Sequence, residues 1–174
     1  PDRLARGLRS KINSQRWRER LLKGADEPLQ PMSAWQREAL QELHGLGRKT
    51  LTEYEARRFV AHWQVTGVRE ERTTTVEAAL AVAGQLGYPV VLKVESPDIP
   101  HKTEAGVVRL GVQSDVELSQ AYTEIMHNAE HHAPNAQVLG VLVQEMVRGG
   151  IETIVGLSQD SLFGPVLLFG MGGI

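Results

Sequence analysis

The sequence of 174 residues contains no cysteine. This absence excludes disulfide bonds, thiolate metal ligands and a cysteine nucleophile within the chain, and it is consistent with a reducing cytoplasm. Any acyl-thioester chemistry must therefore use a thiol from elsewhere, such as that of coenzyme A. No apolar run approaches the roughly 20 residues that a membrane-spanning helix needs, and the N-terminus has no apolar signal-peptide core. We therefore expect a cytoplasmic protein without a membrane partner.

The net charge of −2 is unevenly distributed along the chain. Residues 1–24 carry eight Lys and Arg against two acidic residues, a balance of +6, which leaves −8 for the remainder. An acidic remainder argues against a nucleic-acid partner. The basic segment could contact RNA or a membrane surface, but a solvated helix from a preceding domain is the simpler interpretation. Residues 1–49 are therefore predicted to form a basic helical segment and a linker, with one short helix over 33–43.

Helical and strand patterns alternate from residue 50 onward. In a capping box, a Ser or Thr and a Glu three residues later satisfy each other's backbone donors; such boxes predict helices that begin at Thr52, Thr74 and Ser114. Apolar, β-branched runs predict strands over 90–94, 107–112, 138–147 and 163–170, with 151–157 as the antiparallel partner of 138–147. The pattern predicts a mixed α/β (α+β) fold.

A lysine, Lys93, lies inside the strand predicted at 90–94. Burying an ammonium is costly unless an anion is supplied, so Lys93 is either a phosphate ligand or an edge-strand residue that extends to water. The following loop gathers His101, Lys102 and Thr103 before Gly106. Such a loop can hold a phosphoryl group through charge and backbone N–H groups, and histidine is well suited to phosphorylation near neutral pH. The alternative is an ordinary turn in which His101 caps a carbonyl.

Two acidic residues flank a predicted turn near the C-terminus, Glu145 at the end of a strand and Glu152 beyond two glycines. Their carboxylates could accept from ribose hydroxyls while the neighbouring backbone reads an adenine edge; alternatively, they are exposed residues of a hairpin. His127, His131 and His132 lie where cationic side chains favour a helix dipole, and no metal site is expected there. The sequence also lacks a Walker A pattern and a G-x-S-x-G elbow.

In this order the segments resemble one family. The motifs are LTEYEA at 51–56, LGYPVVLKV at 86–94, SPDIPHKTE at 96–104, GVLVQEMV at 140–147, FGPV at 163–166 and FGMGG at 169–173. They look like the ATP-grasp (β) portion of the NDP-forming acyl-CoA synthetases, relatives of succinyl-CoA synthetase. The resemblance covers about residues 50–174. It implies an incomplete ATP-grasp fold, with 50–140 as the first subdomain and 141–174 as the start of a truncated, nucleotide-binding second one.

The resemblance implies a reversible acid–CoA ligase that converts acid, CoA and ATP into acyl-CoA, ADP and phosphate. In that family a histidine of the CoA-binding part carries a phosphoryl group, and in many members a second histidine, in an H-K-[ST]-[DE] loop, relays it to the nucleotide. His101 matches this second histidine, and Lys93 matches a lysine that contacts nucleotide phosphates. The other implied nucleotide contacts are Lys102, Gly106, the hinge residues Glu145, Met146 and Val147, and Glu152.

The resemblance also implies ATP or ADP with Mg²⁺, whose ligands would lie beyond residue 174, and coenzyme A bound by other domains. The expected partners are CoA-binding and ligase domains of the same chain or of a partner subunit, in a homo- or hetero-oligomer. The N-terminal proline and the C-terminal glycines suggest a piece of a longer polypeptide, which we expect to be inactive alone.

One departure from the family pattern is Gly106-Val107, where two glycines are usual, and it is expected to narrow the room for backbone approach to phosphate. Two other functions remain open for the sequence. One is an ATP-grasp-like regulatory module fused to a protein lysine acetyltransferase, and the other is a non-catalytic nucleotide-binding scaffold.

Overall fold

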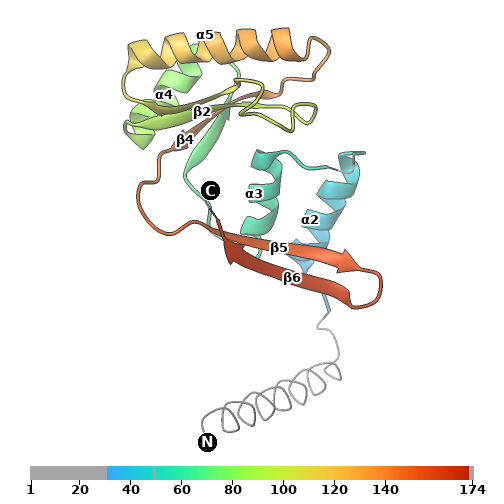
Figure 1. Ribbon diagram of the computed structural model, residues 1–174. Coiled ribbons are helices and arrows are strands. Elements are labelled where there is room, and N and C mark those ends of the chain that lie inside the picture. The colour runs from blue at the N-terminus through green and yellow to red at the C-terminus, as the bar shows by residue number, and fades with distance from the viewer. Residues whose placement is uncertain (1–30, 49, 173–174) are drawn as a thin grey trace, which may run out of the picture. The chain divides into compact units, whose positions relative to one another are not determined.

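The computed structural model describes residues 31–48 and 50–172, which fall into two compact units divided between Gly47 and Arg48 (Figure 1). In the first unit, helix α2 (Ala34–Gly45) begins at a capping box. The Ser33 hydroxyl accepts from the amide of Gln36, and the Gln36 side chain accepts from the amide of Ser33. The helix predicted over 33–43 is thus confirmed, whereas the basic segment predicted at 1–24 lies outside the described residues.

A four-stranded antiparallel sheet organises the second unit, with the strands in the order β1-β4-β2-β3 (Figure 1). The strands are β1 (Glu70–Thr73), β2 (Val90–Glu95), β3 (Val108–Val112) and β4 (Gly140–Glu145). The strands predicted at 90–94 and 107–112 are therefore confirmed as β2 and β3. The pairing places Lys93 of β2 between Leu142 of β4 and Val108 of β3.

Three helices belong to this unit: α3 (Glu53–Ala61), α4 (Val76–Leu86) and α5 (Asp115–His132). The capping box predicted at Thr52 is confirmed, since Thr52 and Glu55 satisfy each other's backbone amides. The cap of α4 is Thr75 rather than the predicted Thr74, and its hydroxyl accepts from the amide of Ala78. The difference arises because β1 extends to residue 73, which leaves Thr74 as the connecting residue.

Helix α5 is the longest helix in the part of the chain that the structure describes. The Ser114 hydroxyl caps it by accepting from the amide of Glu117. The Glu117 carboxylate accepts from the amide of Gln113 rather than Ser114, so only half of the predicted box forms. No helix within residues 31–48 and 50–172 has the length and apolar character needed to cross a membrane.

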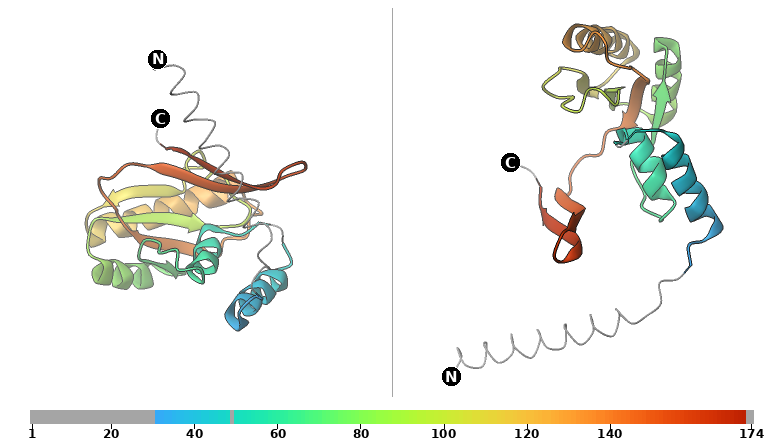
Figure 2. Two further views of the ribbon diagram at one scale, coloured as in Figure 1. Left: turned by 90° about the horizontal axis from the view of Figure 1, so that it is seen from below. Right: turned by 90° about the vertical axis from the view of Figure 1, so that its right-hand side faces the viewer.

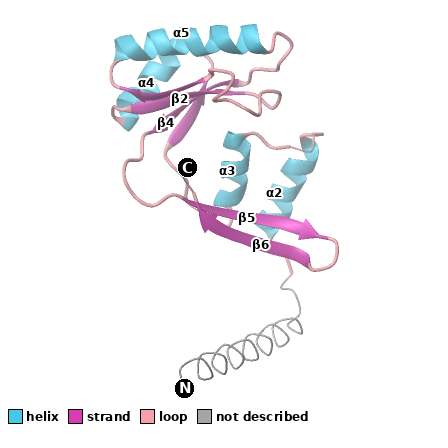
Figure 3. Cartoon of the chain, viewed as in Figure 1, coloured by secondary structure: helices cyan, strands magenta, loops and turns pink. Residues whose placement is uncertain are grey.

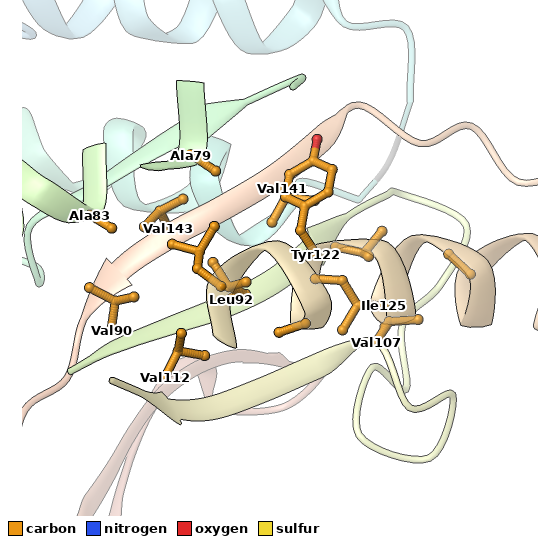
Figure 4. Close-up of a cluster of buried hydrophobic side chains, with 14 of the residues drawn as sticks. Ala79, Ala83, Val90, Leu92, Val107, Val112, Tyr122, Ile125, Val141 and Val143 are labelled. Atoms are coloured by element: carbon orange, nitrogen blue, oxygen red, sulfur yellow. The ribbon is translucent and has the colours of Figure 1, made fainter. Parts of the chain in front are cut away.

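Helices α4 and α5 cover one face of the sheet and enclose the hydrophobic core (Figures 1, 2 and 4). Successive side chains of a strand point to opposite faces, so Val90, Leu92 and Val94 of β2 enter this core. Lys93 and Glu95 face the opposite side, where each contacts the N-terminus of α3. The polar residues of β2 therefore meet α3 instead of the core.

Strands β5 (Thr153–Asp160) and β6 (Gly164–Met171) form a separate antiparallel hairpin (Figure 3). The predicted pairing of 138–147 with 151–157 is wrong, because β4 lies between β1 and β2 and β5 pairs with β6. The hairpin turn is local: the Asp160 carboxylate accepts from the amides of Leu162 and Phe163, and Gly164 adopts a φ of 75°. The two glycines at 149–150 instead lie in the connection between the sheet and the hairpin.

Candidate functional site

The loop between β2 and β3 is fixed at both ends. At its start, the Asp98 carboxylate accepts from the amide of Gln137 at 2.7 Å, and the Ile99 side chain is buried. At its end, the Asn128 amide of α5 donates to the carbonyl of Gly106 at 2.8 Å. Between these anchors, Pro100, His101, Thr103 and Glu104 are exposed. The loop therefore presents its candidate functional side chains on a short, anchored tip.

The backbone of this loop forms its own turns. The amides of Ala105, Gly106 and Val107 donate, each at 3.1 Å, to the carbonyls of His101, Thr103 and Lys102 respectively. These three amides are thus engaged within the loop, so the idea that they would hold a phosphoryl group is not supported. Gly106, with a φ of 65°, serves the turn. The Val107 side chain is buried in the core, so the expected narrowing by this residue does not occur.

A pocket of about 540 Å³ opens beside the loop, and we call it the His101 pocket. Its lining residues are Glu53, Lys93, Pro100, His101, Lys102, Thr103, Glu104, Val108 and Leu110. The structure thus brings three of the predicted site residues, His101, Lys102 and Lys93, to one pocket. Two ammonium groups and an imidazole form a donor set that fits a phosphate group, because phosphate oxygens accept charge-assisted hydrogen bonds.

Lys93 does not extend to water, as the edge-strand alternative required. Its ammonium lies 2.9 Å from Oε1 of Glu53, and the two side chains are only 22% and 25% exposed. The same Glu53 oxygen accepts from Arg57 at 2.6 Å and from the Gln144 amide at 3.0 Å. The anion that a half-buried lysine needs is therefore supplied by the protein itself.

The pKa values of two neighbouring carboxyl groups move in opposite directions. Burial raises the pKa of Glu53, but hydrogen bonds from Lys93 and Gln144 outweigh it and bring the pKa to about 2. Burial also raises the pKa of Glu70, and there it prevails over the Gln144 hydrogen bond and the charge of Arg57. Glu53 is therefore anionic at neutral pH, and it stays ionised to a lower pH than Glu70 does.

The predicted hinge residues lie outside the His101 pocket. The Glu145 carboxylate accepts from the backbone amide and Nε of Arg69, and these hydrogen bonds lower its pKa. Met146 and Val147 follow β4, and Val147 is 67% exposed. Glu152 precedes β5, and its carbonyl accepts from the amide of Gly172 at 2.8 Å. The structure does not bring these predicted contacts to the His101 pocket.

Sequence reasoning missed Glu53, the partner of Lys93, together with Arg57 and Gln144, the other two donors to Glu53. One signal was present in the first turn of α3, which carries two acidic residues although a capping box needs only one. Glu55 forms the box, and Glu53 is left to bind Lys93. No group of three or more His, Cys, Asp or Glu arranged to hold a metal ion occurs among residues 31–48 and 50–172.

Comparison with known families agrees with this fold. Residues 41–174 match the family described as an ATP-grasp domain, and the chain belongs to that family. The chain is also similar to the beta subunit of the ADP-forming acetate–CoA ligase II of Pyrococcus furiosus, with 38% identity over 78% of this chain and 57% of the relative. The predicted resemblance to the ATP-grasp portion of ADP-forming acyl-CoA synthetases is confirmed.

Solved structures give the same result. The dinucleotide-forming acetyl-coenzyme A synthetase 1 of Ca. Korarchaeum cryptofilum, bound to coenzyme A and Ca-AMPCP, is 38% identical with a TM-score of 0.75, over 79% of this chain and 60% of that one. A second complex of that enzyme contains coenzyme A and Mg-AMPPCP, and its phosphohistidine segment points towards the nucleotide binding site. It is 34% identical to this chain, with a TM-score of 0.63 over 80% of this chain and 58% of that one. The chain thus spans less than two thirds of these relatives.

Proposed function

We propose that this chain is the nucleotide-binding part of a reversible acid–CoA ligase that forms ADP, and that His101 carries the phosphoryl group. The observation that carries the proposal is the His101 pocket, in which an exposed imidazole lies with two lysines. The phosphohistidine segment and bound nucleotide analogue of the archaeal synthetase support it. This chain contains no cysteine nucleophile, so the thioester would use a thiol from elsewhere, such as that of coenzyme A, and a reducing cytoplasm would suit the chain.

In the ligase direction, a neutral imidazole nitrogen of His101 attacks the γ-phosphorus of ATP. The N–P bond forms, the bond from phosphorus to the bridging oxygen breaks, and ADP leaves with the electron pair of that bond. The reverse step returns the phosphoryl group to ADP. Lys93 and Lys102 compensate the negative charge of the transferring group, because phosphoryl transfer depends mainly on positioning and electrostatic stabilisation.

Other residues complete the proposed nucleotide site. Glu145, Met146 and Val147 would contact the purine and ribose, and Glu152 would add an acidic contact. Magnesium, whose ligands we expect beyond residue 174, would supply positive charge that neutralises the phosphates. The first subdomain would extend to Glu145, since β4 is part of its sheet, and the nucleotide-binding second subdomain would follow. CoA-binding and ligase domains, in the same chain or a partner subunit, would supply the acyl chemistry.

The test is phosphopeptide mass spectrometry on the intact protein after brief incubation with magnesium and ATP, under conditions that preserve acid-labile phosphate. We expect a base-stable, acid-labile phosphate on the peptide containing His101 and none in a His101→Ala variant. A peptide that stays unmodified while the protein still binds nucleotide would overturn the phosphohistidine proposal. That result would favour the non-catalytic scaffold or the regulatory module of an acetyltransferase.

A further inference from the structure

We infer that Glu53 is the positioning residue for Lys93, holding its ammonium in the His101 pocket so that it meets the transferring phosphoryl group. The inference rests on the proposed function, because it assigns the residue that makes the lysine effective in that step. Its basis is the contact of 2.9 Å between Lys93 Nζ and Glu53 Oε1 at the wall of the pocket. Glu53 acts through Lys93 and does not itself react.

Glu53 is the fixed member of this pair. Its Oε1 accepts from Arg57, one turn further along α3, and from Gln144 of the neighbouring strand β4. A carboxylate with donors from two separate elements cannot follow a moving lysine without breaking those contacts. Lys93, by contrast, has a flexible four-carbon stem and three donors. One donor engages Glu53, which leaves two for phosphate oxygens.

Strand β2 also fixes the helix that carries Glu53. Glu95, two residues after Lys93 and on the same face of the strand, is fully buried, and its Oε1 accepts from the amide of Tyr54 at 3.1 Å. The N-terminus of α3 is therefore attached to β2 at two points, by the side chains of Lys93 and Glu95. An ion pair between a strand lysine and a helix glutamate has the same positioning use in protein kinases.

A competing explanation is that Glu53 only balances charge around Lys93. The chain offers a matched control for it in Glu70. This carboxyl group belongs to the same cluster, where it accepts from the Gln144 amide and lies 3.7 Å from Arg57 Nε. Glu70 does not line the His101 pocket. Glu70→Gln therefore changes the local charge as Glu53→Gln does, but it leaves the contact with Lys93 in place.

The experiment compares intact wild-type protein with the Glu53→Gln and Glu70→Gln variants. Calorimetry measures the Kd for Mg-ATP, rapid quench measures the rate of His101 phosphorylation at saturating ATP, and the Tm reports the fold. We expect Glu53→Gln to slow phosphorylation at least about tenfold while Kd changes less than about threefold, because misplacing a catalytic group costs rate more than binding. Glu70→Gln should stay within about threefold of the wild type in both quantities.

Equal rates in wild type and Glu53→Gln would overturn the inference, and so would an equal loss of rate in both variants, since that result indicates charge balance. A purely structural role would lower the Tm and the affinity together. Should Glu53→Gln fail to fold, Glu53→Asp keeps the charge with a shorter reach, and an unchanged rate in that variant would also overturn the inference. Absence of phosphorylation in the wild type would instead refute the proposed function itself.

Discussion

Arg69 and Glu145 are joined by hydrogen bonds that involve both their backbones and their side chains. The backbone amide and Nε of Arg69 donate to the Glu145 carboxylate at 2.8 and 2.7 Å, and the Glu145 amide donates to the Arg69 carbonyl at 2.9 Å. This pairing fixes the residue at which β4 ends and the proposed nucleotide hinge begins. The hinge thus starts from an ordered point at the edge of the sheet.

We predict that Arg69→Ala weakens nucleotide binding more than it weakens the fold. The Arg69 side chain is 63% exposed, and exposed ion pairs contribute little to stability because solvent screens them. Loss of this ordered start of the proposed hinge should raise the Kd for Mg-ATP about threefold, because binding would then have to order one more side chain. Calorimetry and a thermal melt check this, with Arg109→Ala as the control that breaks an exposed pair with Glu124 elsewhere. Equal affinities in the two variants would refute it.

A second prediction concerns Gly106, which ends the His101 loop. Its φ of 65° is unfavourable for other residues, and a Cβ there would lie 3.1 Å from the Asn128 Nδ2 atom. Gly106→Ala should therefore lower the free energy of unfolding by about 1–2 kcal/mol. Gly84 in α4 is the matched control, because a Cβ there meets nothing within 4 Å, and Gly84→Ala should stabilise by up to about 1 kcal/mol. Urea denaturation distinguishes the two, and equal effects would contradict the prediction.

The elements that could be predicted from the sequence are those set by neighbouring residues. The Thr52 cap depends on a residue three positions away, and β2 is marked by its continuous apolar run. Strand pairing depends on residues far apart: β4 joins β1, about 70 positions earlier, and this long-range contact prevails over the short connection to β5. The turn at Asp160, with its two backbone hydrogen bonds, then gives β5 a nearer partner in β6.

The candidate site divides in the same way. His101 and Lys102 could be predicted because they are adjacent, and Lys93 because a charge in an apolar strand is unusual. Its partner Glu53 could not, since Glu53 lies 40 positions before Lys93. Gln144, which donates to Glu53, lies 91 positions after Glu53. A lysine within an apolar strand pattern indicates that an anion is needed. The pattern does not indicate whether a ligand or the protein itself supplies that anion.

Substitution of Lys93 should separate stability from phosphoryl transfer. Lys93→Met keeps the apolar stem, and Glu53 retains its donors Arg57 and Gln144, so the free energy of unfolding should fall by only about 1 kcal/mol. The rate of His101 phosphorylation should fall about a hundredfold, because a charge at the transferring group is lost. Rapid quench and urea denaturation measure the two effects. A variant that phosphorylates His101 at the wild-type rate would remove Lys93 from the mechanism.

The acid sensitivity of the fold should depend on two carboxyl groups with opposite signs. The pKa of Glu53 is lowered from 4.5 to about 2, so its ionised form stabilises the fold above pH 4.5, and this stability is lost as the pH falls from 4.5 towards 2. The pKa of Glu70 is raised, so its protonation favours the native state as the pH falls through that raised value. Removal of the two carboxyl groups, one at a time, should therefore change the pH dependence of the unfolding free energy in opposite directions.

We expect Glu53→Gln to flatten the loss of unfolding free energy between about pH 5 and pH 2 by up to about 3 kcal/mol, the value of its pKa shift. Glu70→Gln should act at higher pH, because it removes the gain in unfolding free energy that accompanies proton uptake by Glu70 as the pH falls through its raised pKa towards 4.5. Urea denaturation from about pH 7 to about pH 2 measures both effects. If the pH dependence of the unfolding free energy changed in parallel in the two variants, the Gln144 amide, which donates to both carboxylates, would couple them into one titrating group. Glu53 would then not be a separate anion beside Lys93.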